Sequence, residues 1–348
     1  MADQNTTLRH LLSQQKPYIP CTSTTKRNTS YRNWTELGSV TIWREFNLTN
    51  LNESYSHVLD SPLPAREDWL WVNSDLEGVV IQQTADIDHM IGWNDRLMVQ
   101  TVQFAQWQLG LHPGTSIRHQ YSAVDKSVLA RLPGQTGKKL SVDHVISLDC
   151  VPWLNLVVGL GRESSRWSGR SLAGQLDDPN RELLWPLRQL ANICEHAQTR
   201  YGYIQPDEEL VVCCFSKNCQ GLKAEIMPIP WTKSGDEDLT TDLGLWWLCM
   251  LAMSAQSRSI ADEREVLKIN AWVRLYLDEE RGWVRRHQYS RVEEPTSPPP
   301  PPEYMTPSPG NPAAFAAAVG LDTNDWFNID ATEENLMADF VCFNPQLD

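Results

Sequence analysis

Residues 154–162, Leu-Asn-Leu-Val-Val-Gly-Leu-Gly-Arg, decide the fold class of this chain. A continuous apolar run of this kind is typical of a central strand that is covered on both faces. A second β-type stretch, Val142-Asp143-His144-Val145-Ile146, precedes it. The two stretches predict neighbouring strands of one mixed sheet, one carrying Asp143 and the other leading to Arg162.

A long helix is predicted over residues 182–198, because its apolar residues recur at helical spacing. They are Leu183, Leu187, Leu190, Ala191, Cys194 and Ala197. Strands are predicted over 201–205 and 209–215, on either side of a proline-containing turn. The order strand, strand, helix, strand, strand predicts an α+β domain, with a mixed sheet and the helix 182–198 packed across it.

Weaker patterns predict the remaining elements. Alternation of apolar and polar residues predicts a strand over 39–46, and another strand is predicted over 224–229. Apolar periodicity predicts helices over 95–109, 243–254 and 260–280.

The net charge of −14 is unevenly distributed along the 348 residues. No Lys or Arg follows Arg291, whereas ten acids lie in 293–348, which leaves 30 basic and 34 acidic residues in 1–292. The body is therefore nearly neutral, and this composition excludes a strongly basic DNA-binding domain.

Composition divides the chain into four parts. Residues 1–36 are polar and predict a flexible, disordered arm, and 37–292 predict the globular domain. Residues 293–312 contain five consecutive prolines and predict an extended linker. Residues 313–348 alternate acids with apolar residues and predict a disordered tail that docks onto a protein partner. The docking side chains expected there are Trp326, Phe327, Leu336 and Phe340.

The N-terminus lacks the apolar core of a signal peptide. The longest dense apolar run, Leu243 to Met253, is too short to cross a bilayer. The eight cysteines are scattered, as is typical of reduced thiols. These features predict an intracellular protein, nuclear or cytoplasmic, without membrane association.

A family resemblance rests on several motifs in order: Asp143, Leu156-Val157-Val158-Gly159, Ser165-Arg166-Trp167, Arg188-Gln189-Leu190, and Thr199 to Ile204 followed by Glu209-Leu210-Val211-Val212. Over residues 140–255 the chain resembles fungal PD-(D/E)xK nuclease-like proteins. The resemblance implies a restriction-endonuclease-like fold.

In that family an acid on one strand and an acid-x-Lys triplet on the next hold Mg²⁺, which activates water for phosphodiester cleavage. Asp143 matches the first acid and is the metal ligand, if there is one. The triplet is degenerate: it is Leu160-Gly161-Arg162, so the acid is missing, while Arg162 keeps the charge of the Lys. Gln189 matches a helical Gln that often joins this site, so the catalytic candidates are Asp143, Arg162 and Gln189.

Two other groups of residues have competing interpretations. His144 is either a packed histidine or a base. Arg281, Arg285 and Arg286 surround aromatic residues, as in sites that bind nucleic acid. The alternative for these arginines is a solvated helix end that attracts the chain's own acidic tail.

The leading functional prediction is a non-catalytic nuclease-fold protein, a pseudoenzyme that acts as a regulatory or binding module, tied to a fungal specialised gene cluster. The first alternative is an active Mg²⁺-dependent DNA or RNA nuclease, with Glu163 or Glu225 as the second acid. The second alternative is an adaptor that binds no nucleic acid. No cofactor is expected, or Mg²⁺ if the protein is active.

Overall fold

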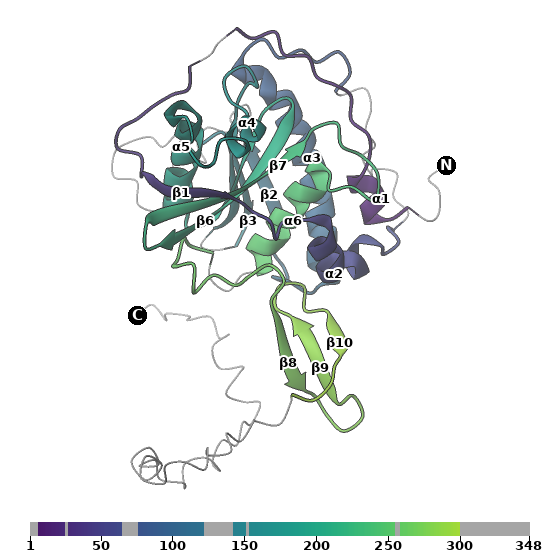
Figure 1. The fold of residues 1–348 in the computed structure, drawn as a ribbon. Helices are drawn as coiled ribbons and strands as arrows, with labels where there is room; N and C mark the ends of the chain where they lie inside the picture. The colour runs from purple at the N-terminus through teal and green to yellow at the C-terminus, as the bar shows by residue number, and fades with distance from the viewer. Residues whose placement is uncertain are drawn as a thin grey trace, which may run out of the picture. The chain divides into compact units, whose positions relative to one another are not determined.

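A seven-stranded mixed sheet forms the centre of the protein, in the order β1-β7-β6-β5-β4-β3-β2 (Figure 1). The computed structural model describes residues 6–24, 27–64, 76–121, 142–150, 153–254 and 258–299. The pairs β1–β7 and β4–β5 are parallel, and the other neighbours are antiparallel. The strands are β1 (Leu37–Ile42), β2 (Ile117–Tyr121), β3 (His144–Leu148), β4 (Leu154–Gly161), β5 (Tyr201–Gln205), β6 (Glu209–Asn218) and β7 (Gly221–Pro230).

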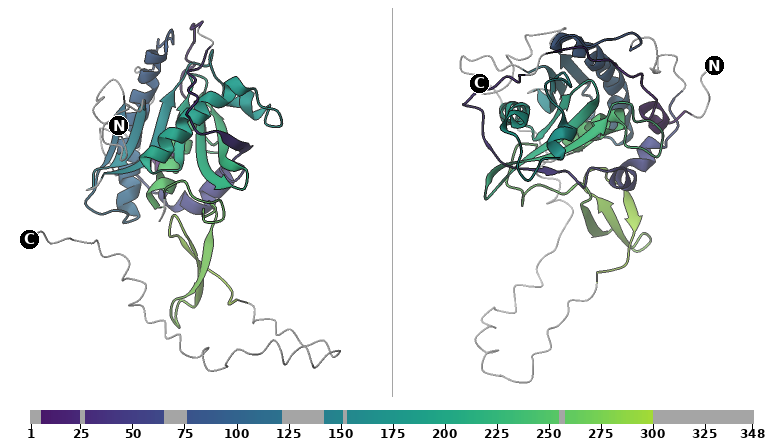
Figure 2. Two further views of the ribbon diagram at one scale, coloured as in Figure 1. Left: turned by 90° about the vertical axis from the view of Figure 1, so that its left-hand side faces the viewer. Right: turned by 45° about the horizontal axis from the view of Figure 1, so that its top comes forward.

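Helices cover both faces of this sheet (Figures 1 and 2). On one face, α5 (Arg181–Ala197) packs over the strands, with the short helix α4 (Gly169–Ala173) near β7. The other face carries α1 (Leu8–Leu12), α2 (Leu48–Leu59), α3 (Asp88–Gln108) and α6 (Thr241–Ser254), with the 3₁₀ turn η1 (Thr84–Ile87) before α3. Each face has its own apolar core, so the central strands are buried on both sides.

The predicted α+β class and the mixed sheet flanked by helices are confirmed. The strands predicted around Asp143 and over 154–162 are β3 and β4, which pair antiparallel. Asp143 directly precedes β3 and Arg162 directly follows β4. The crossover from β4 through α5 to the parallel strand β5 places that helix across the sheet, as its apolar spacing predicted.

The prediction of a flexible arm over 1–36 is wrong for residues 8–20, which pack against the body, whereas 27–36 are mostly exposed. Leu8, Leu11 and Leu12 of α1 are fully buried, and Ile19 is buried as well. Trp231 Nε1 donates a hydrogen bond of 3.0 Å to the Pro17 carbonyl. The polar composition of this segment concealed a few leucines whose packing partners are distant in sequence.

The helix predicted over 260–280 is also wrong. Instead, β8 (Trp272–Tyr276), β9 (Trp283–His287) and β10 (Glu293–Pro295) form a separate sheet in the order β10-β9-β8 (Figure 1). β-branched and aromatic residues at 272–276 favour a strand, and Gly282, with φ of +65°, closes the hairpin.

The ring of His287 fixes this small sheet to the body. Its Nε2 lies 3.2 Å from Ser54 Oγ and 2.9 Å from the Ile269 carbonyl.

The predicted linker begins later than residue 293, because Glu293 and Glu294 belong to β10 and the compact unit extends to Ser297.

The expected docking residues Trp326, Phe327, Leu336 and Phe340 lie outside the described residues. Among residues that are described, no helix is both long and apolar enough to span a bilayer.

Candidate functional site

The structure brings Asp143, Arg162 and Gln189 together. Arg162 Nη1 lies 3.4 Å from Asp143 Oδ2, and Arg162 Nη2 donates a hydrogen bond of 2.5 Å to Gln189 Oε1. Nη1 also donates to the carbonyl of Gly161. One guanidinium thus links the carboxylate before β3 to the amide on α5.

Backbone contacts at the end of β4 fix this arrangement. The Gly161 N–H donates to Asp143 Oδ2 at 3.0 Å, so the carboxylate is held by the neighbouring strand. The Arg162 N–H donates to the Gln205 carbonyl at 3.0 Å, which extends the β4–β5 pairing by one residue. Gln189 reaches the same point because α5 crosses directly over these strands.

Burial dominates the electrostatics of the site. It raises the pKa of Asp143, while Arg162 and the Gly161 N–H oppose that rise. The Arg162 side chain is only 9% exposed and that of Asp143 is 25% exposed. Because a guanidinium keeps its proton in proteins, the site holds a fixed positive charge beside the carboxylate.

Leu160 cannot supply the missing acid. Its side chain is fully buried in the apolar core beneath α5, together with Val158 and Leu187. Val158 and Leu160 share this face because side chains alternate along a strand.

The two acids proposed as substitutes have other positions. Thr84 Oγ1 donates to Glu163 Oε1 at 2.8 Å, and Arg166 Nε lies 2.6 Å from Glu163 Oε2. Glu163 is thereby held between η1 and the chain after β4. Glu225 lies on β7, four strands from β3, or about 19 Å at the usual strand spacing.

Behind the site, on the face toward α3, lies a group of residues of which the sequence indicated only His144. His144 stacks on Tyr203 with ring centroids 5.9 Å apart, and the His119 ring lies 6.3 Å from that of His144. Asp95 Oδ1 lies 3.5 Å from His119 Nδ1. These residues come from α3, β2, β3 and β5, so no local motif connects them.

Burial controls the titration of this group. It lowers the pKa of His119 to about 3, lowers that of His144 well below its ordinary value, and raises that of Asp95 to about 6. His144 is only 1% exposed and stacks on the buried ring of Tyr203, so it has no access to a substrate. This favours the packed-histidine interpretation of His144 over a base.

The arginines predicted to bind nucleic acid form ion pairs within the small sheet. Arg285 Nε donates to Glu294 Oε2 at 2.7 Å, and Arg286 Nε donates to Glu293 Oε1 at 2.8 Å. Arg281 also pairs with Glu293. All three arginines thus pair with the two carboxylates of β10, which leaves one positive charge in excess, and they do not form a free basic patch.

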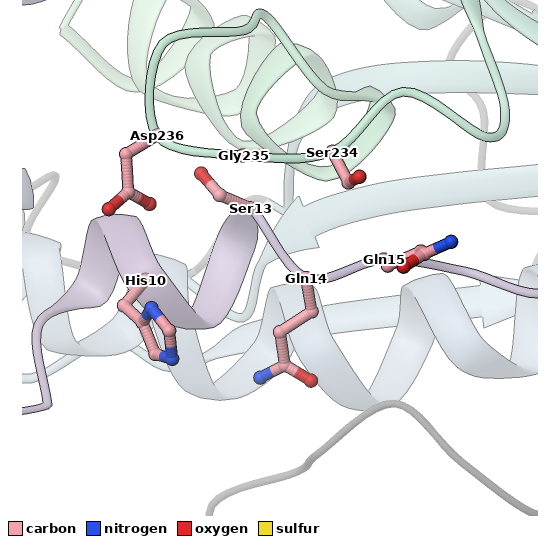
Figure 3. Close-up of a pocket in the computed structure, with 7 residues that line it drawn as sticks. All are labelled: His10, Ser13, Gln14, Gln15, Ser234, Gly235 and Asp236. Atoms are coloured by element: carbon pink, nitrogen blue, oxygen red, sulfur yellow. The ribbon is translucent and has the colours of Figure 1, made fainter.

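Two shallow polar grooves lie elsewhere. One of about 570 Å³ separates α1 from the loop before α6 and is lined by His10, Ser13, Gln14, Gln15, Ser234, Gly235 and Asp236 (Figure 3). Figure 3 shows these polar side chains on two facing segments, and the Gly235 N–H donates to the Ser13 carbonyl at 2.9 Å. The other groove, near α4, has four serines beside Arg170 and Glu208. Neither groove gathers three metal-ligating side chains, and no such group occurs in the described part of the chain.

No protein-family profile, curated protein or solved structure matches the chain. Membership of the PD-(D/E)xK-like group therefore stays a prediction that rests on the motifs and their order.

Proposed function

We propose that this chain is a non-catalytic binding module derived from a PD-(D/E)xK nuclease scaffold. The observation that carries the proposal is the position of Arg162, whose guanidinium contacts both Asp143 and Gln189. In this scaffold, that position between the acid and the glutamine is where the metal would bind. An internal cation of the protein takes its place.

The chemistry of phosphodiester cleavage supports the proposal. Mg²⁺ prefers several oxygen ligands and lowers the pKa of a bound water. Here the second ligand position is the buried Leu160, and the one carboxylate is already paired with Arg162. A divalent cation at Asp143 would have to displace a guanidinium that is only 9% exposed.

Cleavage assays test the loss of activity. The full-length protein, incubated with DNA or RNA and Mg²⁺ or Mn²⁺, is expected to leave both substrates intact. Metal-dependent cleavage that disappears in Asp143→Ala but persists in Asp149→Ala would overturn the proposal. Asp149 is a suitable control because it lies at the opposite end of β3 and pairs with Arg118.

Calorimetry tests the nuclease ancestry. The wild type is expected not to bind Mg²⁺ at this site, whereas the double variant Leu160→Glu/Arg162→Lys gains an oxygen ligand beside Asp143. The matched control is Leu160→Gln/Arg162→Lys, which has the same size without the new charge. Equal heats of Mg²⁺ binding for both double variants would show that Leu160-Gly161-Arg162 has been wrongly aligned with the acid-x-Lys triplet.

We propose a regulatory setting, nuclear or cytoplasmic and linked to a fungal specialised gene cluster, in which the acidic tail captures a protein partner. Deletion of 313–348 is expected to leave the melting temperature of the body unchanged and to abolish activation of a reporter. A large loss of thermal stability on deletion would make the tail part of the folded domain and reject its docking role.

A further inference from the structure

The small sheet has one open edge. β8 is a terminal strand, and within the described residues no strand pairs with its outer side. The Gln288 N–H donates to the Ala271 carbonyl and the Leu277 N–H donates to the Gly282 carbonyl. Because inward and outward groups alternate in antiparallel pairs, Trp272, Arg274 and Tyr276 turn their N–H and carbonyl groups outward.

The side chains of these same three residues share one face of the sheet. Their cross-strand partners are His287, Arg285 and Trp283, respectively. The Tyr276 and Trp283 rings meet edge to face at 5.6 Å, and Tyr276 is 54% exposed. The open edge therefore presents an aromatic residue, a cation and a second aromatic residue in succession.

The middle row of side chains on this face carries two positive charges and only one negative charge. It runs across the sheet from Glu294 through Arg285 to Arg274. Arg285 is paired with Glu294, whereas Arg274 has no ionic partner among the described residues. Two like charges lie directly opposite each other, which is unfavourable unless an acid lies on the outer side.

We propose that the β8 edge binds an extended acidic peptide as a fourth strand. An acid of the peptide lies opposite Arg274, and apolar residues two positions before and after it lie against Trp272 and Tyr276. The recognised pattern is apolar-x-acid-x-apolar, with affinity from main-chain hydrogen bonds and specificity from alternate side chains. The inference deepens the proposed binding function by naming the class of partner.

Single-stranded nucleic acid fits this edge less well. A phosphate backbone requires several free cations for substantial affinity. Arg281, Arg285 and Arg286 are each paired with one of the two carboxylates of β10, and Arg274 is the cation at the open edge without an ionic partner in the described part of the chain. One unpaired arginine matches one acidic side chain better than a chain of phosphates.

A charge swap tests the side-chain contact. Fluorescence anisotropy of the full-length protein uses two labelled peptides of alternating Thr and Phe with either Glu or Lys at the centre. The wild type is expected to prefer the Glu peptide by at least about threefold, and Arg274→Glu to prefer the Lys peptide. Arg264→Glu, an exposed charge reversal outside the sheet, is expected to keep the wild-type preference.

A proline substitution tests the main-chain contact. Arg274→Pro removes an outward N–H but none of the β8–β9 hydrogen bonds, as edge strands tolerate. A loss of about tenfold in affinity for the Glu peptide is expected with an unchanged melting temperature. Arg274→Ala, which also lacks the guanidinium but keeps the N–H, is the matched control, and the tenfold loss is measured against it.

Three outcomes would reject the inference: equal binding of both peptides, Arg274-dependent binding of a single-stranded oligonucleotide instead, or Arg274-dependent dimerisation in light scattering. The last would assign the edge to a second copy of the chain. Each of these three outcomes rejects only the peptide-binding inference. The non-catalytic proposal fails only if the protein cleaves nucleic acid, so the two failures are distinguishable.

Discussion

The ammonium of Lys16 donates a hydrogen bond of 2.7 Å to Oδ1 of Asp242, across 226 residues of sequence. It also donates to Thr241 Oγ1 and lies 4.2 Å from the centre of the Trp231 ring. The lysine and aspartate side chains are both buried. This contact joins the N-terminal segment to the start of α6 and makes it part of the core.

Replacing Lys16 with Ala is expected to lower the free energy of unfolding by about 3–5 kcal/mol, because Asp242 would remain buried without its cation. Urea unfolding followed by circular dichroism measures this loss. Lys233→Ala is the control: its pair with Asp238 is exposed, so a change below about 1 kcal/mol is expected. Equal losses in the two variants would refute an anchoring role for Lys16.

Arg162→Met is expected to cost about 3 kcal/mol of unfolding free energy, because the mostly buried Asp143 would lose its counter-charge. Adding Asp143→Asn to that variant is expected to recover part of the loss, since the amide still accepts from the Gly161 N–H. Chemical denaturation of both single variants and the double variant gives the coupling free energy between Arg162 and Asp143. Additive effects of the two substitutions would show that the pair is not coupled.

Gly159→Ala is expected to destabilise the protein by about 1–3 kcal/mol. A Cβ at this position would lie 2.5 Å from Tyr203 Cζ, and that ring is fully buried beside His144. At Gly174 the nearest atom would be 3.7 Å away, so Gly174→Ala serves as a control with a change near zero. Thermal unfolding distinguishes the two variants, and an unaffected Gly159→Ala would contradict the close packing on β4.

The Asp95 carboxyl is expected to make stability depend on pH. Burial raises its pKa to about 6, so the folded state holds the proton more tightly than the unfolded state. The resulting stabilisation is present below about pH 4 and is lost as the pH rises through about 6, by at most about 3 kcal/mol because the carboxyl is partly exposed. In Asp95→Asn this decline is expected to disappear from urea titrations between pH 4 and 7. Parallel curves for wild type and variant would exclude the effect.

The centre of the fold was predictable because its signals are local. The apolar run from Leu154 and the helical spacing of α5 each lie within one element, and Asp143, Arg162 and Gln189 follow from that order. The burial of Leu8, Leu11 and Leu12 was not predictable, because isolated leucines in a polar segment are buried only through packing partners in α6, which are distant in sequence. For the same reason Asp95 and His119 formed no recognisable motif.

The segment 260–280 was misassigned for a different reason. Short apolar runs fit both helical and strand periods, and the run from Trp272 to Tyr276 is only five residues long and has no polar–apolar alternation to mark a strand. Pairing with β9 decides the outcome, and that pairing depends on a hairpin whose turn lies beyond the run.

The pairing of β1 with β7 has a consequence for synthesis on the ribosome. β1 is made early, yet its partner strand, residues 221–230, emerges only after most of the domain has been translated. Until then β1 has no strand to pair with, and the leucines of α1 lack their packing partners in α6. Long-range closure of this kind slows folding and exposes apolar surface. The nascent chain is thus expected to depend on chaperone binding near its N-terminus until α6 has left the exit tunnel.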